Sequence, residues 1–143
     1  MSHEPTTPVT QALAAYAAAV HAKDVEAFTA LYADDVHVFD SWGQWQYSGI
    51  GEWREMAAGW FGSLGDERVE VEFRDVRSSV GEDVAFGHAA VTFAGVSAQG
   101  ERQRSMTNRL TLNLAKQEGV WKIVHEHSSL PIDLESGKGI FSR

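Results

Sequence analysis

The feature that most constrains the fold is the regular alternation of apolar and polar residues in the second half of the chain. Leu110, Leu112 and Leu114, for example, are each separated by one polar residue. Successive side chains of a β-strand point to opposite faces, so this period of two indicates strands with one buried face. Pro131 ends the last segment, because proline has no N–H to donate to a ladder. The expected strands cover residues 69–76, 84–96, 102–116 and 120–130.

The first half of the chain instead repeats apolar residues every three or four positions, as amphipathic helices do. Thr7 followed by Pro8 predicts the cap and first position of a helix that runs to about Ala22. Asp24 is expected to cap a second helix, and Gly65 to close a third. The expected elements are helices over about 8–22, 25–34 and 53–64 and a short strand over 36–40.

Helices followed by a strand meander predict an α+β fold, in which a curved antiparallel sheet wraps around three N-terminal helices as a cone-shaped α+β barrel. Val76 falls out of phase with the strand before it, which predicts a bulge or bend near Asp75. We expect a single domain over residues 1–143, with a core of about 9–133 and a loose tail over 134–143. The centre of such a cone is expected to hold a small-molecule cavity.

Composition narrows the classes of partner. The chain carries 12 lysines and arginines against 20 aspartates and glutamates, a formal net charge of −8. No basic run interrupts this acidity, so we expect no nucleic acid and no membrane as partners. The sequence contains no cysteine, which leaves neither disulfide nor thiolate chemistry. The N-terminal residues lack a signal-peptide pattern and no apolar run approaches the ~20 residues of a membrane helix, so a cytoplasmic location is expected.

Two histidines stand where the last strand should continue its apolar face. His125 and His127 follow Trp121 and Ile123 at the same two-residue spacing, and side chains two residues apart share a face. If the tryptophan and isoleucine face the cavity, both imidazoles line its wall, where they take or give protons near neutral pH. The alternative is a core histidine bonded to a carbonyl or carboxylate, and a bulge before Pro131 would turn His127 away.

Asp40 ends the expected first strand, between Phe39 and an aromatic loop that contains Trp42 and Trp45. A carboxylate among these rings would be partly desolvated, which raises its pKa towards the range of a general base. The same carboxylate equally suits orienting a histidine and fixing its tautomer. The simpler alternative is a solvated aspartate that accepts hydrogen bonds from loop amides.

The His-x-His spacing also suits two ligands of one metal ion, with His88 or Asp40 as a third ligand. Two-residue spacing of histidines on a strand is common, however, and neither a cysteine pair nor a glycine-rich phosphate loop accompanies it. We therefore expect no metal and no other cofactor, and keep a metal site as the minority alternative.

Further aromatic and polar side chains are expected to contact a ligand. Trp42 and Trp45 lie in a loop, where they suit either a lid over a flat apolar ligand or a dimer interface. Arg109 suits an anionic group of the ligand, or the outer face of the sheet beside a glutamate of another strand. The expected ligand contacts are Tyr16, Trp42, Trp45, Tyr47, Trp60, Phe86, His88 and Arg109.

Three segments of the chain resemble the SnoaL-like, or nuclear-transport-factor-2-like, superfamily, which contains the ketosteroid isomerases and scytalone dehydratase. They are GVWKIVHEHSSLP at 119–131, ALYADDVHVFD at 30–40 and YSGIGEWREM at 47–56. The resemblance implies the cone fold and places Asp40 near the pocket. It also implies a wide choice of functions, because this scaffold hosts isomerases, dehydratases, cyclases, binding proteins and association modules. The set that resembles scytalone dehydratase, in residue type only, is Asp40, His125, Tyr47 and Tyr16.

We therefore predict an acid/base enzyme without a cofactor that isomerises, dehydrates or cyclises a small apolar molecule. His125 is expected to be the general acid/base, with Asp40 orienting it or acting as the base. His127, Tyr47 and Arg109 are expected to polarise oxygen atoms of the substrate. The alternatives are a module of the same fold that only binds a small molecule, and a homodimerisation module that buries the outer face of the sheet.

Overall fold

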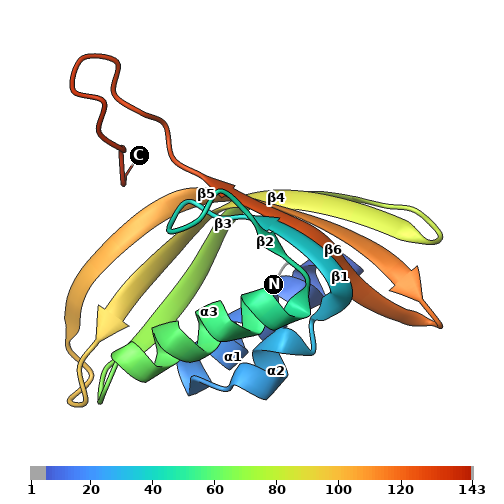
Figure 1. The fold of residues 1–143 in the computed structure, drawn as a ribbon, viewed down its shortest axis with the longest axis horizontal. Helices are drawn as coiled ribbons and strands as arrows, with labels where there is room; N and C mark the ends of the chain where they lie inside the picture. Colours follow the sequence, from blue (N-terminus) through green and yellow to red (C-terminus); the bar gives the residue numbers. More distant parts are fainter. Residues whose placement is uncertain (1–5, 143) are drawn as a thin grey trace, which may run out of the picture.

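The structure is a computed structural model in which residues 6–142 are described. Three helices occupy one side of the molecule: α1 (Pro8–Ala22), α2 (Val25–Thr29) and α3 (Ile50–Ser63). α1 begins with the expected cap, a capping box formed by Thr7 and Thr10. A curved sheet arches over the helices, which lie against its concave side (Figure 1). The α+β class and the cone-like arrangement are confirmed. Within residues 6–142, no helix is long and apolar enough to cross a membrane.

The sheet has six strands within the described residues, in the order β2-β1-β6-β5-β4-β3. They are β1 (Tyr32–Phe39), β2 (Tyr47–Ser48), β3 (Arg68–Val80), β4 (Val84–Val96), β5 (Arg102–Gln117) and β6 (Val120–Ser129). β3 to β6 form the expected antiparallel meander, but β1 runs parallel to β6. The expectation of a wholly antiparallel sheet is wrong at this pair, because α3 and the meander lie between β1 and β6 and return the chain in the same direction.

The second helix is shorter than its apolar pattern predicts. Asp24 caps α2 as expected, by accepting a hydrogen bond from Ala27 N at 3.0 Å. The helix then ends at Thr29, and β1 begins at Tyr32. The backbone carbonyl of Leu31 accepts a hydrogen bond from the amide of β6 residue Ile123 at 2.9 Å. Because of this pairing with β6, residues 32–34, which we expected to continue the helix, belong to the sheet.

Phe28 of α2 lies at the centre of the hydrophobic core, with no exposed surface. Its ring centroid is 5.3 Å from those of Tyr16 and Tyr32, 6.0 Å from that of Trp53 and 5.8 Å from that of Phe61. These rings come from all three helices and from β1, so one aromatic cluster joins the helices to the sheet. Tilted and edge-on ring pairs of this kind contribute ~0.5–1.5 kcal/mol each beyond their burial.

Register shifts interrupt the pairing of each neighbouring pair among β3 to β6, and two of them bear on the expectations and on the cavity. The register of β3 against β4 shifts between Arg74 and Arg77, and Asp75 between them has a φ of 55°. The bulge predicted near Asp75 is therefore confirmed, and it bends β3 as a bulge does in other sheets. The second bulge, at Val124 of β6, was not expected and decides which side chains face the cavity.

The C-terminal segment forms a small hairpin that projects from the sheet and then returns to it (Figure 1). Ile132 and Gly139 pair as an isolated bridge. The carbonyl of Phe141 accepts a hydrogen bond from Thr107 N of β5 at 2.8 Å, and the Phe141 ring stacks on Trp42 with centroids 5.3 Å apart. This segment is therefore held against the body of the protein, which differs from the loose tail that we expected; the last residue lies outside the described residues.

Replacing Phe28 by alanine should lower the free energy of unfolding by about 3–5 kcal/mol, because a buried ring leaves a cavity that its neighbours fill only in part. Urea denaturation at neutral pH measures this loss. Leu134→Ala is the control: this side chain is 100% exposed, so the change should stay within about 0.5 kcal/mol. Equal losses in the two variants would show that the cluster around Phe28 is not the centre of the core.

Candidate functional site

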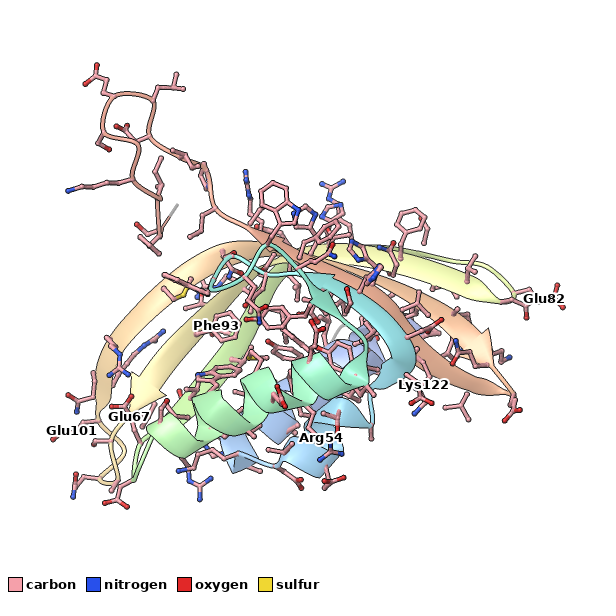
Figure 2. The ribbon with its side chains drawn as sticks, viewed as in Figure 1. Arg54, Glu67, Glu82, Phe93, Glu101 and Lys122 are labelled. Atoms are coloured by element: carbon pink, nitrogen blue, oxygen red, sulfur yellow. The ribbon has the colours of Figure 1, made fainter. Side chains whose placement is uncertain are left out.

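A cavity of about 480 Å³ lies between the concave face of the sheet and the helices. Phe93 of β4 projects into the space between the arch and α3 (Figure 2). A volume of this size suits a small organic molecule. The apolar part of the lining consists of Trp42, Tyr47, Trp53, Met56, Trp60, Leu64, Val69, Phe93, Met106 and Leu110. The polar part consists of Tyr16, Asp40, Arg104, Ser105, Asn108, Glu126 and Ser128.

Asp40 follows directly after β1 and lies beside Ser128 of β6. The Ser128 hydroxyl donates a hydrogen bond to Asp40 Oδ1 at 2.8 Å, and itself accepts one from Ser41 N at 2.9 Å. Burial raises the pKa of Asp40 above its usual value, while the hydrogen bonds from Ser128 and from the Ser41 and Trp42 amides lower it. The result is a carboxylate that is partly desolvated but held in one orientation, as a general base requires.

Glu126 lies on the inner face of β6 and is 2% exposed. The Tyr32 hydroxyl donates a hydrogen bond to Glu126 Oε1 at 2.6 Å. Burial raises the pKa of Glu126 to about 8, the hydrogen bond from Tyr32 opposes this rise, and the charge of Asp40 adds to it. Glu126 is therefore mainly protonated at neutral pH, so its carboxyl group has a proton to donate.

Tyr16 of α1 completes the polar end of the cavity from the side of the helices. Burial raises its pKa well above the usual value, and the charges of Glu126 and Asp40 raise it further. The phenol therefore keeps its proton and is a hydrogen-bond donor. The acidic end of the cavity, which consists of Asp40, Glu126, Tyr16 and Ser128, thus offers one candidate base and several candidate donors.

The bulge in β6 explains why Glu126 faces the cavity. β5 pairs Leu114 with Ile123 and then Asn113 with His125, so Val124 has no opposite residue. One extra residue reverses the alternation, because side chains of a strand change face at every position. Ile123 points inward before the bulge, and after it the inward positions are Glu126 and Ser128.

The expectation that His125 and His127 line the cavity is therefore wrong, because both lie on the outer, convex face of the sheet. Neither contributes to the cavity wall. His125 Nδ1 makes a 2.7 Å hydrogen bond with the carbonyl of His37. The alternative of a carbonyl-bonded histidine is thus correct in the bond, although the ring lies on the outer face and not in the core. The two imidazole rings pack edge-on against Phe39, at centroid distances of 4.9 Å and 5.4 Å. The two histidines therefore pack against Phe39 on the outer face of β6.

The other expected ligand contacts divide between the two faces. Four of the expected residues line the cavity: Tyr16, Trp42, Tyr47 and Trp60. Phe86 and His88 lie outside it, because the inward positions of this part of β4 are Ala85 and Ala89. Trp45 is 92% exposed in its loop. The expectation that Trp45, Phe86 and His88 contact a cavity ligand is therefore wrong.

Arg109 also lies on the convex face, because its neighbours Asn108 and Leu110 take the inward positions of β5. Its guanidinium Nε donates a hydrogen bond to Ser129 Oγ at 3.1 Å. The outer-face alternative for Arg109 is thus correct in position, although the partner is a serine and not a glutamate. The expectation that Arg109 polarises a substrate oxygen inside the cavity is wrong.

The structure brings no metal-binding group together in the part of the chain that it describes: no three histidine, aspartate or glutamate side chains are arranged to hold an ion. Asp40 lines the cavity, whereas His88 and His127 lie on the convex face. The metal ligands considered from the sequence therefore lie on opposite faces of the sheet and cannot bind one ion together.

Sequence reasoning missed Glu126, Ser128, Asn108 and Tyr32 as functional candidates. A local signal for the first two was present, because Ile123 and Val124 are adjacent apolar residues in an otherwise alternating strand. The same kind of phase change at Val76 led to the correct bulge near Asp75. Applied to Val124, it would have exchanged the inward and outward positions of β6.

Known proteins resemble this chain over most of its length. The family model of the SnoaL-like domain matches residues 9–133. An NTF2-like protein of unknown function from Pseudomonas putida is similar in structure, with a TM-score of 0.83 and 25% identity over 93% of this chain and 91% of that chain. No curated protein matches the chain.

Two further solved structures share the fold at lower identity. An uncharacterized protein with a cystatin-like fold from Caulobacter vibrioides has a TM-score of 0.69 and 19% identity, over 85% of this chain and 86% of that chain. A nuclear transport factor 2-like superfamily protein from Salmonella enterica has a TM-score of 0.69 and 20% identity, over 92% of this chain and 94% of that chain. These similarities extend over most of both chains in each pair.

Glu126 should make the folded protein less stable as the pH rises. Its pKa is about 8 in the folded chain against a usual value of 4.5, so between these values the unfolded chain releases a proton that the folded chain retains. The contribution is fully present below pH 4.5 and is lost as the pH approaches 8, by at most about 1.4 kcal/mol per pH unit. Glu126→Gln should flatten this dependence in urea unfolding across that range.

The matched control is Glu55→Gln, a change of the same type on the exposed side of α3. It should keep the pH dependence of the unmodified protein. If Glu126→Gln and Glu55→Gln show the same slope of stability against pH, Glu126 does not hold its proton in the folded state.

Proposed function

The chain belongs to the SnoaL-like domain family, and we propose that it is an acid/base enzyme that moves a proton on a small, largely apolar molecule without a cofactor. The observation that carries this proposal is the pair of carboxyl groups at one end of an apolar cavity, Asp40 and Glu126. The pKa of each is raised by burial. Two carboxyl groups in such a setting divide into a base and an acid.

Asp40 is the proposed base. Ser128 and the amides of Ser41 and Trp42 donate hydrogen bonds to its carboxylate, which favours the ionised form of Asp40 over that of Glu126. Its raised pKa makes it a better proton acceptor than a solvated aspartate. The fixed orientation of the group supports attack on one C–H bond of a bound substrate.

Glu126 is the proposed acid. Its proton is not used by Tyr32, since the Tyr32 hydroxyl is the donor in their hydrogen bond. The proton of Glu126 therefore serves an oxygen atom of the substrate, and the Tyr16 hydroxyl is a second candidate donor. A neutral carboxyl group that donates to a developing enolate oxygen is the arrangement known from ketosteroid isomerase.

In the proposed reaction, Asp40 removes a proton from a carbon next to a carbonyl group, and the C–H electron pair forms the new C=C bond. The carbonyl π electrons move to the oxygen, which is stabilised by the Glu126 proton. If the substrate has a second C=C bond next to the deprotonated carbon, the oxygen electrons reform the C=O bond, the double bonds shift, and the far carbon takes the proton from Asp40, which completes an isomerisation. If it has a β-hydroxyl group instead, reforming the C=O bond breaks the C–O bond, and the hydroxyl leaves as water with the proton from Glu126. The proton on Asp40 then passes through solvent and restores Glu126. Positioned acid and base groups supply ~10²–10⁴ in rate each.

A hydrogen–deuterium exchange assay tests this proposal without knowledge of the natural substrate. The protein in D₂O should accelerate exchange of the protons next to the carbonyl of 1-tetralone, a flat bicyclic ketone, followed by NMR. Asp40→Asn should lower the protein-dependent rate by ~10²–10⁴ and Glu126→Gln by ~10²–10³. His125→Ala and His127→Ala are the controls and should retain the full rate, since neither lines the cavity.

The exchange rate should have a bell-shaped dependence on pH. It should rise as Asp40 ionises, above the usual aspartate range because the pKa of Asp40 is raised by burial. It should fall near pH 8, where Glu126 loses its proton. Full exchange activity in Asp40→Asn would refute Asp40 as the base. Tetralone binding without any exchange would leave a binding module as the function of the cavity.

We further propose that the convex face of the sheet pairs with a second copy of the chain. Phe39 is 37% exposed and Phe86 is 53% exposed on this face, and exposed apolar side chains on a sheet favour burial between protomers. Phe86→Asp should therefore shift the protein towards a monomer in light scattering, whereas Glu55→Gln should not. A chain that is monomeric at every concentration before mutation would contradict the proposal.

A further inference from the structure

Asn108 lies on the inner face of β5, at the same alternation as Leu110 and Leu112. It is 5% exposed and forms part of the cavity wall. Its neighbours towards the cavity are apolar, since Val91 lies opposite it on β4 and Met106 is the next inward residue of β5. A carboxamide group thus stands within a largely apolar part of the wall.

The side-chain oxygen of Asn108 is buried and has no hydrogen-bond partner within residues 6–142. Buried polar atoms are bonded in the great majority of cases, and an unpaired one lowers stability. By contrast, two acceptors at the acidic end are bonded: Asp40 Oδ1 accepts from Ser128 and Glu126 Oε1 accepts from Tyr32. An unpaired acceptor in a cavity wall is therefore best explained by a ligand that pairs with it.

We infer that Asn108 binds a hydroxyl group of the substrate, so that the cavity takes hydroxylated ketones in preference to plain ones. This inference rests on the proposed function, which assigns the carbonyl group to Glu126. A hydroxyl group both donates and accepts, so it pairs with either end of the Asn108 carboxamide. The unpaired oxygen also explains the discrimination: a ligand without the hydroxyl leaves that oxygen buried and unbonded.

The position of Asn108 limits the size of this ligand. Leu110 pairs with Ser128 across β5 and β6, which places it at the acidic end of the cavity. Asn108 lies two residues further along β5, at a distance of roughly 7 Å. The substrate class is therefore a compact ring system that carries a carbonyl group and a hydroxyl group about one fused ring apart. Trp60 and Phe93 in the wall suit contact with a flat ring.

A binding experiment tests the inference with 1-tetralone and its 5-, 6- and 7-hydroxy derivatives at about pH 6, where a phenol keeps its proton. Dissociation constants are measured by calorimetry. At least one hydroxy derivative should bind about tenfold or more tightly than 1-tetralone to the unmodified protein. Asn108→Leu should reduce that ratio to about one. Asn113→Leu, the same change on the outer face of β5, should preserve it, since Asn113 does not line the cavity.

A stability measurement tests the same inference without a ligand. If Asn108 is kept for binding, replacing it with leucine removes an unbonded polar atom from the protein, so Asn108→Leu should unfold at the same or a higher urea concentration. Asn108→Ala should retain the fold and also lose the preference for hydroxylated tetralones. A lower unfolding midpoint in Asn108→Leu would show that the carboxamide is bonded within the fold and would overturn the inference.

The remaining outcomes separate this inference from the proposed function. Equal affinities for all tetralones, no detectable binding of any of them, or a hydroxyl preference that persists in Asn108→Leu would each refute the role of Asn108. Loss of the proposed function has another signature: no tetralone exchanges its protons for deuterium faster than in buffer. Exchange of 1-tetralone by the unmodified protein, together with a hydroxyl preference that Asn108→Leu abolishes, supports both.

Discussion

One unpaired residue, Val124, decides the chemistry of the cavity. Because side chains alternate along a strand, a single extra residue moves every later side chain of β6 to the opposite face. The bulge brings Glu126 and Ser128 under the arch beside Asp40, and it leaves the histidines of β6 outside. The acidic end of the cavity thus depends on a backbone irregularity as much as on the types of residue in the strand.

Burial then sets the acidity of the two carboxyl groups in the cavity. An apolar wall stabilises a carboxylate less well than water does, so the pKa values of Asp40 and Glu126 both rise. Their hydrogen bonds distinguish them: Ser128 and two backbone amides favour the charge on Asp40, and that charge disfavours a second one on Glu126. The division into base and acid therefore follows from position within one cavity.

Local patterns predicted the fold class and most elements, since a period of two located β4 and the caps Thr7 and Asp24 located two helix starts. They did not predict the parallel pairing of β1 with β6, because no local signal specifies which distant strand becomes a neighbour. The site was predictable in part. Asp40 lines the cavity as expected, whereas Glu126 was missed because its face depends on the bulge at Val124. Alternation predicts a face only while the register is unbroken.

The stacking of Phe141 on Trp42 connects the C-terminal segment to the cavity, because the same tryptophan forms part of the cavity wall. A change at Phe141 therefore reaches an aromatic ring of the cavity wall. Phe141 is consequently a position outside the cavity from which its aromatic wall can be altered.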